Sequence, residues 1–178
     1  MNQNKLYMLI GLARSGKSTI ANKWVNHEIY FTIDGQIKNY HVLELEPRVV
    51  VNGDAWRLAM GHRYNTYVEP IVAGHVQIAV RALLQTHNVL VDETNTNEKS
   101  ILKWLEEDIN AIPVFVNTPA EICKERALKT GQPDLVPVID RMNINLTKTF
   151  GKNLDILGTV QKLREEAQIR HSFKRIVV

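Results

Sequence analysis

The chain has 178 residues, of which 44% are hydrophobic and 23% charged, so it suits one globular domain (residues 1–178) and is too short for two comfortable ones. Its 22 basic and 19 acidic residues give a formal charge of +3, which permits an anionic substrate, such as a nucleotide or a nucleic-acid end, without requiring one. A single cysteine, Cys123, excludes an intramolecular disulfide and fits the reducing cytoplasm better than secretion, so we expect a cytoplasmic protein.

Short apolar runs alternate with helical patterns along the chain. The first run, Leu6–Ile10, meets a glycine and predicts a buried strand; it is too short for a signal-peptide core or a membrane span. Further strands are predicted at residues 49–51, 89–91 and 112–116, and helices at residues 17–27, 67–85, 98–109, 119–129 (capped by Thr118), 137–146 and 154–171. For residues 173–178 a closing strand and a frayed end are both open. The alternation predicts an α/β fold with a central parallel sheet covered on both faces.

Residues 28–45 break this alternation. Asp34-Gly35 lies between two β-prone runs, residues 29–33 and 37–45, which is typical of a β-hairpin. Because the segment falls between the first helix and the second strand of the parallel sheet, we interpret it as a hairpin inserted outside that sheet.

Residues 11–18 match the phosphate-binding pattern G-x-x-x-x-G-K-[ST] at every fixed position, after a predicted strand and at the start of a predicted helix. Glycines let backbone amides turn inward to form an anion-binding nest, and the dipole and free N–H groups of the helix face the same site. Lys17 is placed to reach the β- and γ-phosphates of ATP, and the Ser18 hydroxyl to ligate Mg²⁺. The candidate nucleotide-binding residues are Gly11, Ala13, Arg14, Ser15, Gly16, Lys17, Ser18 and Thr19. A chance match in a glycine turn is the alternative, which the flanking strand and helix disfavour.

The second strand runs into a segment that carries Asp54 and Arg57. Open α/β sheets place their sites at the carboxyl ends of strands, so we expect this segment beside the phosphate loop. There Asp54 can accept a proton from an attacking hydroxyl. If a helix begins at Asp54, Arg57 lies on the same side and can bind an anionic group of the acceptor bidentately. The alternative is that Asp54 is only a helix N-cap and Arg57 a solvated side chain.

The third strand runs into Asp92-Glu93, which looks like a Walker B segment. Asp92 would then position Mg²⁺. Glu93 is a candidate base for ATP hydrolysis or a partner for Arg57. Residues 94–97, Thr-Asn-Thr-Asn, either contact the substrate or shape the loop through Asx-type hydrogen bonds.

A basic helix is predicted after the fourth strand. It carries Arg126 and ends at Lys129-Thr130-Gly131. Such a helix can fold over the phosphates as a lid that excludes water and stabilises the transferred charge. A solvated basic face explains the same residues.

The order of these motifs resembles the kinase domain of phage-type polynucleotide 5′-hydroxyl kinases and their AAA-like P-loop relatives. That family has G-x-x-G-S-G-K-S-T, then D-x-x-R, an apolar strand ending in D-T-N-x-N, a lid helix with an arginine and a V-P segment. The counterparts here are residues 11–19, 54–57 and 89–97, Arg126 and Val136-Pro137, so the resemblance covers most of the chain. It implies a P-loop NTPase three-layer sandwich with a helical lid.

The resemblance also implies a role for each matching residue. Lys17 and Ser18 would hold ATP with Mg²⁺. Asp54 would be the general base for the acceptor hydroxyl, and Arg57 would bind the acceptor's phosphate. Arg126 would belong to the lid and contact the nucleotide.

Two features depart from the family pattern. The family's lid has a second arginine four positions after the first, where Thr130 stands here; Lys129 or Arg14 is a candidate substitute. The hairpin at residues 28–45 is extra, and its function as an acceptor platform, a dimer contact or a decoration is open. Its aromatic side chains either stack on an acceptor or, as we expect, pack in the core; they are Tyr30, Phe31 and Tyr40.

The leading hypothesis is an ATP-dependent kinase that phosphorylates the 5′-hydroxyl of DNA or RNA. A second hypothesis keeps the fold but changes the acceptor to a nucleoside, nucleotide, sugar-nucleotide or modified base. A third is a P-loop ATPase, favoured by Asp92-Glu93 but disfavoured because the chain has no room for the small helical domain of AAA motors. A binding module with an inactive nucleotide site is least favoured, since Lys17, Ser18, Asp54 and Asp92 are all present. No membrane partner is indicated, and the motifs do not predict an oligomeric state.

Overall fold

The computed structural model describes residues 4–39 and 46–176 of the chain. Its central sheet consists of parallel strands in the order β4-β5-β1-β6. The strands are Arg48–Val51 (β4), Asn88–Val91 (β5), Leu6–Ile10 (β1) and Ile112–Phe115 (β6). The register pairs Met8 of β1 with Val91 on one side and with Pro113 on the other. The predicted α/β fold with a central parallel sheet is therefore confirmed.

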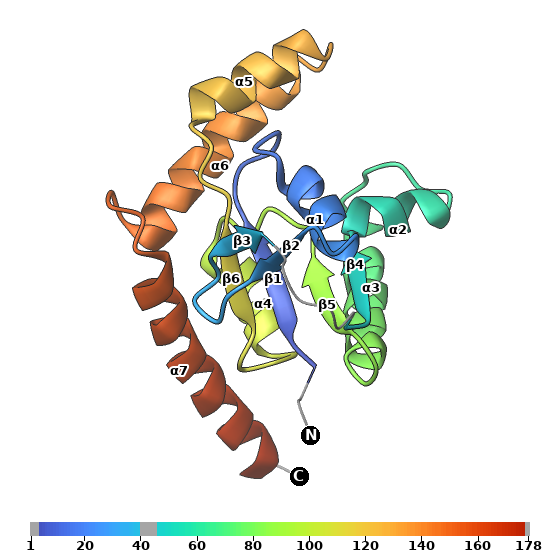
Figure 1. The fold of residues 1–178 in the computed structure, drawn as a ribbon, viewed down its shortest axis with the longest axis vertical. Helices are drawn as coiled ribbons and strands as arrows, with labels where there is room; N and C mark the ends of the chain where they lie inside the picture. Colours follow the sequence, from blue (N-terminus) through green and yellow to red (C-terminus); the bar gives the residue numbers. More distant parts are fainter. Residues whose placement is uncertain (1–3, 40–45, 177–178) are drawn as a thin grey trace.

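Strand β1 is buried on both faces because it lies in the middle of the sheet (Figure 1). Leu6, Met8 and Ile10 belong to one hydrophobic cluster, whereas Tyr7 and Leu9 belong to another. Successive side chains of a strand point to opposite faces. One continuous apolar run therefore contributes to the core on both sides of the sheet.

Helices cover the two faces of the sheet unequally (Figure 1). The helices that flank the sheet are α1 (Lys17–Val25), α3 (Glu69–Leu83), α4 (Glu98–Leu105) and α7 (Ile156–Ile176). The apolar sides of α3, α4 and α7 pack against the face that carries Met8. Helix α1 packs against the other face, where Trp24 stacks on Phe31 of the hairpin with ring centroids 5.8 Å apart. The layers are thus helices, sheet, and one helix with a hairpin.

The hairpin predicted from Asp34-Gly35 is confirmed in its described part. Strands β2 (Ile29–Phe31) and β3 (Ile37–Asn39) pair antiparallel and form a sheet of their own. Phe31 is buried in the core, as expected, so its ring is not exposed to an acceptor. Tyr40 and the rest of the second run, to residue 45, lie outside the described residues.

The tip of the hairpin lies against the outer edge of the sheet. Gly35 has a φ of +77°, and a Cβ on it would stand 1.8 Å from the carbonyl oxygen of Pro113 in β6. Pro113 has no N–H to present at this edge. The hairpin covers the neighbouring carbonyl, so together they protect the open edge of the sheet from pairing with another strand.

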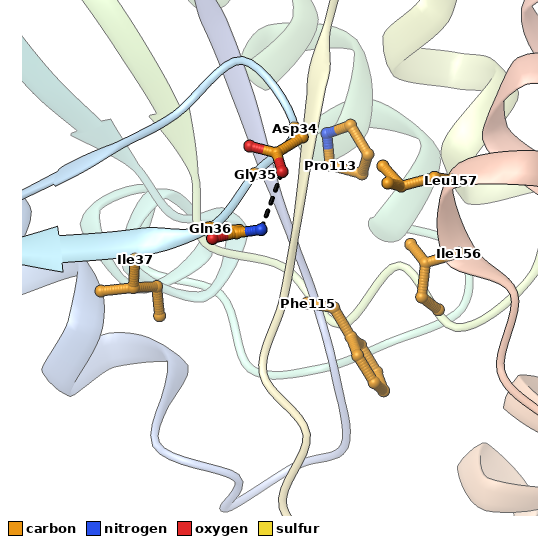
Figure 2. A pocket seen from close by; sticks show the side chains of 8 residues that line it. All are labelled: Asp34, Gly35, Gln36, Ile37, Pro113, Phe115, Ile156 and Leu157. Atoms are coloured by element: carbon orange, nitrogen blue, oxygen red, sulfur yellow. Dashed lines mark hydrogen bonds between the residues drawn. The ribbon is translucent and has the colours of Figure 1, made fainter.

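A pocket of about 370 Å³ opens between this tip, β6 and the start of α7 (Figure 2). Asp34 and Gln36 form its polar side and share a hydrogen bond of 2.9 Å, while apolar side chains of β6 and α7 form the opposite side. The lining residues are Asp34, Gly35, Gln36, Ile37, Pro113, Phe115, Ile156 and Leu157. None of them is a candidate site residue, so the pocket is separate from the predicted site.

Two helices, α5 (Ala120–Lys129) and α6 (Leu135–Phe150), pack against each other and extend beyond the sheet, next to the phosphate loop (Figure 1). Leu12 of that loop packs with Cys123 of α5 and Ile139 of α6. Burial raises the pKa of the Cys123 thiol. The cysteine is therefore a small packing residue and a weak nucleophile.

Two local predictions about helix ends are wrong. Helix α7 continues to Ile176, so the described part of residues 173–178 is helical and not the predicted strand. Pro119, not Thr118, occupies the N-cap position of α5, and the Thr118 hydroxyl instead donates to the Ser15 carbonyl at 2.8 Å. Among the helices that the structure describes, none combines the length and apolar character needed to cross a membrane.

Candidate active site

The phosphate loop joins the end of β1 to the start of α1. The Gly11 N–H donates to the Thr94 carbonyl at 2.9 Å, which ties the loop to the segment after β5. Gly16, at the N-cap of α1, has a φ of +102°, a conformation that favours glycine. No described side chain caps this end of the helix. The first N–H groups of α1 are therefore left to bind an anion.

Lys17 is buried within this loop. Its ammonium group donates to the carbonyl oxygens of Leu12, at 2.5 Å, and Gly11, at 3.2 Å. Burial lowers the pKa of Lys17, and the Asp92 carboxylate opposes that shift. A buried cation held mainly by carbonyl dipoles is costly unless an anion compensates it, which favours phosphate binding here.

The remaining loop residues line the same turn. Ala13 and Arg14 are half-buried, and Thr19 is exposed in the first turn of α1. The Ser15 hydroxyl is buried beside Gly11 and has no hydrogen-bond partner among the described residues. A buried hydroxyl of this kind needs a further polar partner, such as a bound phosphate or water.

Ser18 and Asp92 meet where α1 begins and β5 ends. The Ser18 hydroxyl donates to Asp92 Oδ2 at 2.8 Å. Asn52 Nδ2 donates to the same carboxylate oxygen at 3.2 Å and to the Asp92 carbonyl at 3.0 Å. At nucleotide sites Mg²⁺ takes one or two protein oxygens, and phosphates and waters supply the rest. The structure therefore brings together the two residues predicted to bind the metal.

Asn52 also connects Asp92 to helix α2 (Gly53–Ala59). Its Oδ1 accepts a hydrogen bond from the Ala55 N–H at 2.9 Å, so Asn52 is the N-cap of α2. The alternative in which Asp54 is the N-cap is therefore wrong. The Asp54 side chain is 79% exposed in the first turn of the helix, which leaves its carboxylate open to a substrate.

Arg57 lies one turn after Asp54 and is held by two carboxylates. Its Nη1 donates to Asp54 Oδ1 at 2.6 Å, and its Nε and Nη2 donate to the Glu69 carboxylate at 2.5 and 2.8 Å. The hydrogen bonds that the Arg57 guanidinium donates to Glu69 raise the pKa of that guanidinium, which therefore stays charged. Arginine has five N–H donors, so about two are left for an anionic acceptor. Sequence reasoning misses Glu69, because no motif or helical spacing joins it to Arg57.

Glu93 pairs with Lys103 at 2.8 Å rather than with Arg57. The predicted partnership of Glu93 with Arg57 is therefore wrong, and Glu69 takes that place. The Lys103 ammonium also lies 4.1 Å from the ring centroid of Trp104, a further contact that holds it beside Glu93. A carboxylate engaged in this way is poorly suited to activate water.

Residues 94–97 shape the loop after β5. Asn95 is buried; its Nδ2 donates to the Leu9 carbonyl at 2.8 Å, and its Oδ1 accepts from the Trp104 indole at 3.2 Å. Asn97 is the N-cap of α4 and accepts a hydrogen bond from the backbone of Ser100. The loop-shaping alternative is therefore correct for these two residues, and Asn95 does not contact a substrate.

Arg126 of α5 lies over the phosphate loop. Its Nη1 donates to the carbonyl oxygen of Arg14 at 3.1 Å. The Arg14 guanidinium donates in turn to the Thr130 hydroxyl at the end of α5. Lys129 instead pairs with Glu125 on the exposed side of the helix, at 2.6 Å. Of the two candidate substitutes for a second lid arginine, Arg14 is therefore the one in contact with Thr130.

No protein-family model matches the sequence, and no curated protein matches it significantly. Solved structures do match the fold. A chain of the Pnkp1/Rnl/Hen1 RNA repair complex is 23% identical, with a TM-score of 0.65, and covers 84% of this chain. A gluconokinase from Sinorhizobium meliloti 1021 is 14% identical, with a TM-score of 0.50, over 98% of this chain and 99% of its own. The chain has the fold of the P-loop kinases.

These matches show a shared fold, because their sequence identities are low. A third solved structure, APE1195, is 17% identical with a TM-score of 0.53, over 77% of this chain and 76% of its own. The present chain spans only 46% of the length of the matching chain in the RNA repair complex, and 40% in a second structure of that complex. The matches therefore indicate the fold, and the chemistry of this chain depends on the residues of its own site.

Those residues fit a nucleotide with Mg²⁺. The uncapped start of α1, the buried Lys17 ammonium and the unpartnered Ser15 hydroxyl suit phosphate oxygens. The adjacent Ser18 hydroxyl and Asp92 carboxylate suit Mg²⁺. These features occupy the carboxyl-terminal edge of the parallel sheet, where such sites are expected.

Proposed function

We propose that this chain is an ATP-dependent kinase that transfers the γ-phosphate of ATP to a hydroxyl, and that the acceptor is the 5′-hydroxyl of a polynucleotide. The observation that carries the proposal is the hydrogen-bonded path from Ser18 through Asp92 and Asn52 to the helix that bears Asp54. This path supports the proposal because it joins the predicted metal-binding pair to the helix whose first turn carries the exposed Asp54 carboxylate.

In the proposed reaction the acceptor hydroxyl gives its proton to Asp54. The Asp54 oxygen Oδ1 accepts a hydrogen bond from Arg57, so Oδ2 is the oxygen that receives the proton. The acceptor oxygen bonds to the γ-phosphorus as the bond between that phosphorus and the β–γ bridging oxygen breaks, and ADP leaves. The negative charge that spreads over the transferred group is stabilised by Lys17 and by Arg126 of the lid.

Three protein side chains provide the metal and acceptor positions in this scheme. Ser18 and Asp92 would hold Mg²⁺, which neutralises charge on the phosphates when it is bound. The remaining donors of Arg57 would bind an anionic group of the acceptor, such as the phosphate that follows the 5′-nucleoside. Glu69 would keep the Arg57 side chain in position for this contact.

The acceptor is the finer part of the proposal. An RNA repair complex contains a chain with this fold, which supports a nucleic-acid end. A gluconokinase shares the fold as well, so a small hydroxyl acceptor is the second candidate. Hydrolysis of ATP as the main activity is disfavoured, because the Glu93 carboxylate, the candidate base for water, forms an ion pair with Lys103.

An acceptor screen with γ-labelled ATP and Mg²⁺ tests this proposal. The panel holds 5′-hydroxyl DNA and RNA oligonucleotides, nucleosides, nucleotides, sugar-nucleotides and a tube without acceptor. We expect label on the oligonucleotides and little release of inorganic phosphate in the tube without acceptor. Preferential labelling of a small acceptor would replace the polynucleotide with that acceptor, and phosphate release without any transfer would contradict a kinase.

A further inference from the structure

The connection between α2 and α3 is an exposed loop next to Arg57. All residues from 61 to 67 are exposed; we call them the 61–67 loop. It contains two tyrosines, Tyr64, which is 72% exposed, and Tyr67, which is 88% exposed. Trp56 of α2 is also partly exposed near the start of the loop. Aromatic rings at this level of exposure contribute little to the core, so their presence next to a candidate site points to a ligand.

The backbone of the 61–67 loop is anchored at both ends. At its start, the His62 N–H donates to the Arg57 carbonyl at 3.0 Å. At its end, the side chain of Asn65 accepts from the Tyr67 N–H at 2.9 Å, and its carbonyl accepts from the Glu69 N–H at 3.0 Å. These bonds hold the backbone that carries the tyrosines, which lowers the backbone entropy lost on binding.

Tyr64 is directly connected to the proposed acceptor site. The Arg57 guanidinium lies 5.5 Å from the centroid of the Tyr64 ring. The arginine proposed to bind an acceptor phosphate is thus covered on one side by an exposed aromatic ring. Arg63, next to Tyr64, adds an exposed positive charge.

Aromatic faces interleaved with cations are the chemistry that binds unpaired bases and their phosphates. A base in a duplex is already stacked and offers no free face. The hairpin aromatics do not compete for this role within the described residues, because Phe31 is buried and Tyr30 is half-buried. Among the described residues, the exposed tyrosine ring in contact with the arginine that pairs with Asp54 is that of Tyr64, in the 61–67 loop.

We propose that the 61–67 loop binds the unpaired bases that follow the 5′-hydroxyl of a single-stranded nucleic acid, with Tyr64 and Tyr67 stacking on successive bases. The proposal rests on the kinase function proposed above and specifies its acceptor as a single-stranded end of two or more nucleotides.

The test compares kcat/KM for a 5′-hydroxyl hexanucleotide with that for a nucleoside 3′-monophosphate, in the wild type, in Tyr64→Ala and in Tyr67→Ala. Stacking on one aromatic ring changes binding by about 5- to 100-fold, so the preference for the hexanucleotide should fall by that factor, mainly through KM. Tyr64→Phe keeps the ring and should keep the preference. Ile33→Ala, which truncates an equally exposed side chain on the hairpin, serves as the matched control and should change nothing.

The outcomes separate this proposal from the kinase function. If the wild type phosphorylates the hexanucleotide and Tyr67→Ala and Tyr64→Ala each keep its preference within twofold, the stacking loop is overturned and the kinase stands. This is also the result expected if the loop instead docks a partner protein. If the wild type transfers phosphate to no oligonucleotide, both proposals fail together.

Discussion

The guanidinium of Arg14 donates a hydrogen bond to the hydroxyl of Thr130, so the middle of the phosphate loop contacts the last residues of α5. One turn earlier on α5, Arg126 donates to the Arg14 carbonyl. The loop and the proposed lid are thus joined at two points. Thr130 stands where the resembled family carries a second lid arginine, and its hydroxyl accepts a hydrogen bond from Arg14 of the loop.

Arg14→Ala should therefore lower kcat for phosphate transfer. Loss of one positive donor near the transferred phosphate is expected to cost on the order of 100-fold in kcat, with a smaller effect on KM for ATP. Steady-state kinetics with a saturating acceptor measure this. Lys129→Ala is the control, because Lys129 pairs with Glu125 on the surface. A larger loss in Lys129→Ala than in Arg14→Ala would assign the second lid cation to Lys129.

Glu69→Gln should raise KM for the acceptor about tenfold. The carboxylate makes two of the three described hydrogen bonds of Arg57, and a charged hydrogen bond is worth about 1.5–3 kcal/mol. Glu107→Gln is a matched control, since Glu107 also binds an arginine, Arg81, through two hydrogen bonds. We expect the control to lower the melting temperature without changing the acceptor KM. An unchanged KM in Glu69→Gln would show that Arg57 does not need this anchor.

Lys17→Met should raise the free energy of unfolding of the nucleotide-free protein at pH 7. Burial lowers the pKa of Lys17 below its ordinary value of 10.5, so the folded state carries a cost for keeping the ammonium charged. That cost is fully present below the folded-state pKa and is relieved as the pH rises from there toward 10.5. The advantage of the variant should therefore shrink in that window.

Thermal melts at pH 7 and pH 10 measure this effect, at about 2–4 °C for each kcal/mol in a chain of this size. The same variant should lose the rise in melting temperature that ATP with Mg²⁺ gives the wild type. A lower melting temperature for Lys17→Met at pH 7 without nucleotide would mean that its hydrogen bonds to Gly11 and Leu12 outweigh the burial cost.

Gly35→Ala should destabilise the protein more than Gly131→Ala does. Both glycines lie in turns with positive φ, +77° and +68°, so both variants carry a backbone penalty for the added Cβ. Only at Gly35 would the new Cβ meet a backbone atom, the Pro113 carbonyl oxygen at 1.8 Å. We expect an extra loss of about 1–3 kcal/mol, as for other overpacked sites. Equal losses in urea unfolding would show that the hairpin tip does not press on β6.

Local pattern predicts most of this fold. The run Leu6–Ile10 is apolar at every position, which is typical of a strand with two buried faces, and it lies inside the sheet between two other strands. The turn at Asp34-Gly35 predicts the hairpin because few residues other than glycine adopt the required φ. The spacing of the phosphate loop likewise depends on consecutive residues, so one sequence is enough to identify it.

The contacts that complete the site join residues that no local pattern connects. Arg57 and Glu69 are 12 positions apart, and Arg14 and Thr130 are 116 apart. Glu69 begins α3 and Glu93 comes just after β5. Both are glutamates, so residue type alone does not predict which of them pairs with Arg57. Helix α3 packs against α2, which brings Glu69 to Arg57, and Glu93 instead forms an ion pair with Lys103.

The most direct test of the central claim measures transfer of γ-labelled phosphate from ATP to a 5′-hydroxyl oligonucleotide by the wild type, Asp54→Asn and Glu93→Gln. We expect transfer by the wild type, a loss of about 100- to 10,000-fold in Asp54→Asn with ATP binding retained, and transfer close to wild type in Glu93→Gln. Full transfer by Asp54→Asn would rule out Asp54 as the general base. Release of inorganic phosphate without labelling of the oligonucleotide, lost in Glu93→Gln, would identify an ATPase instead of a kinase.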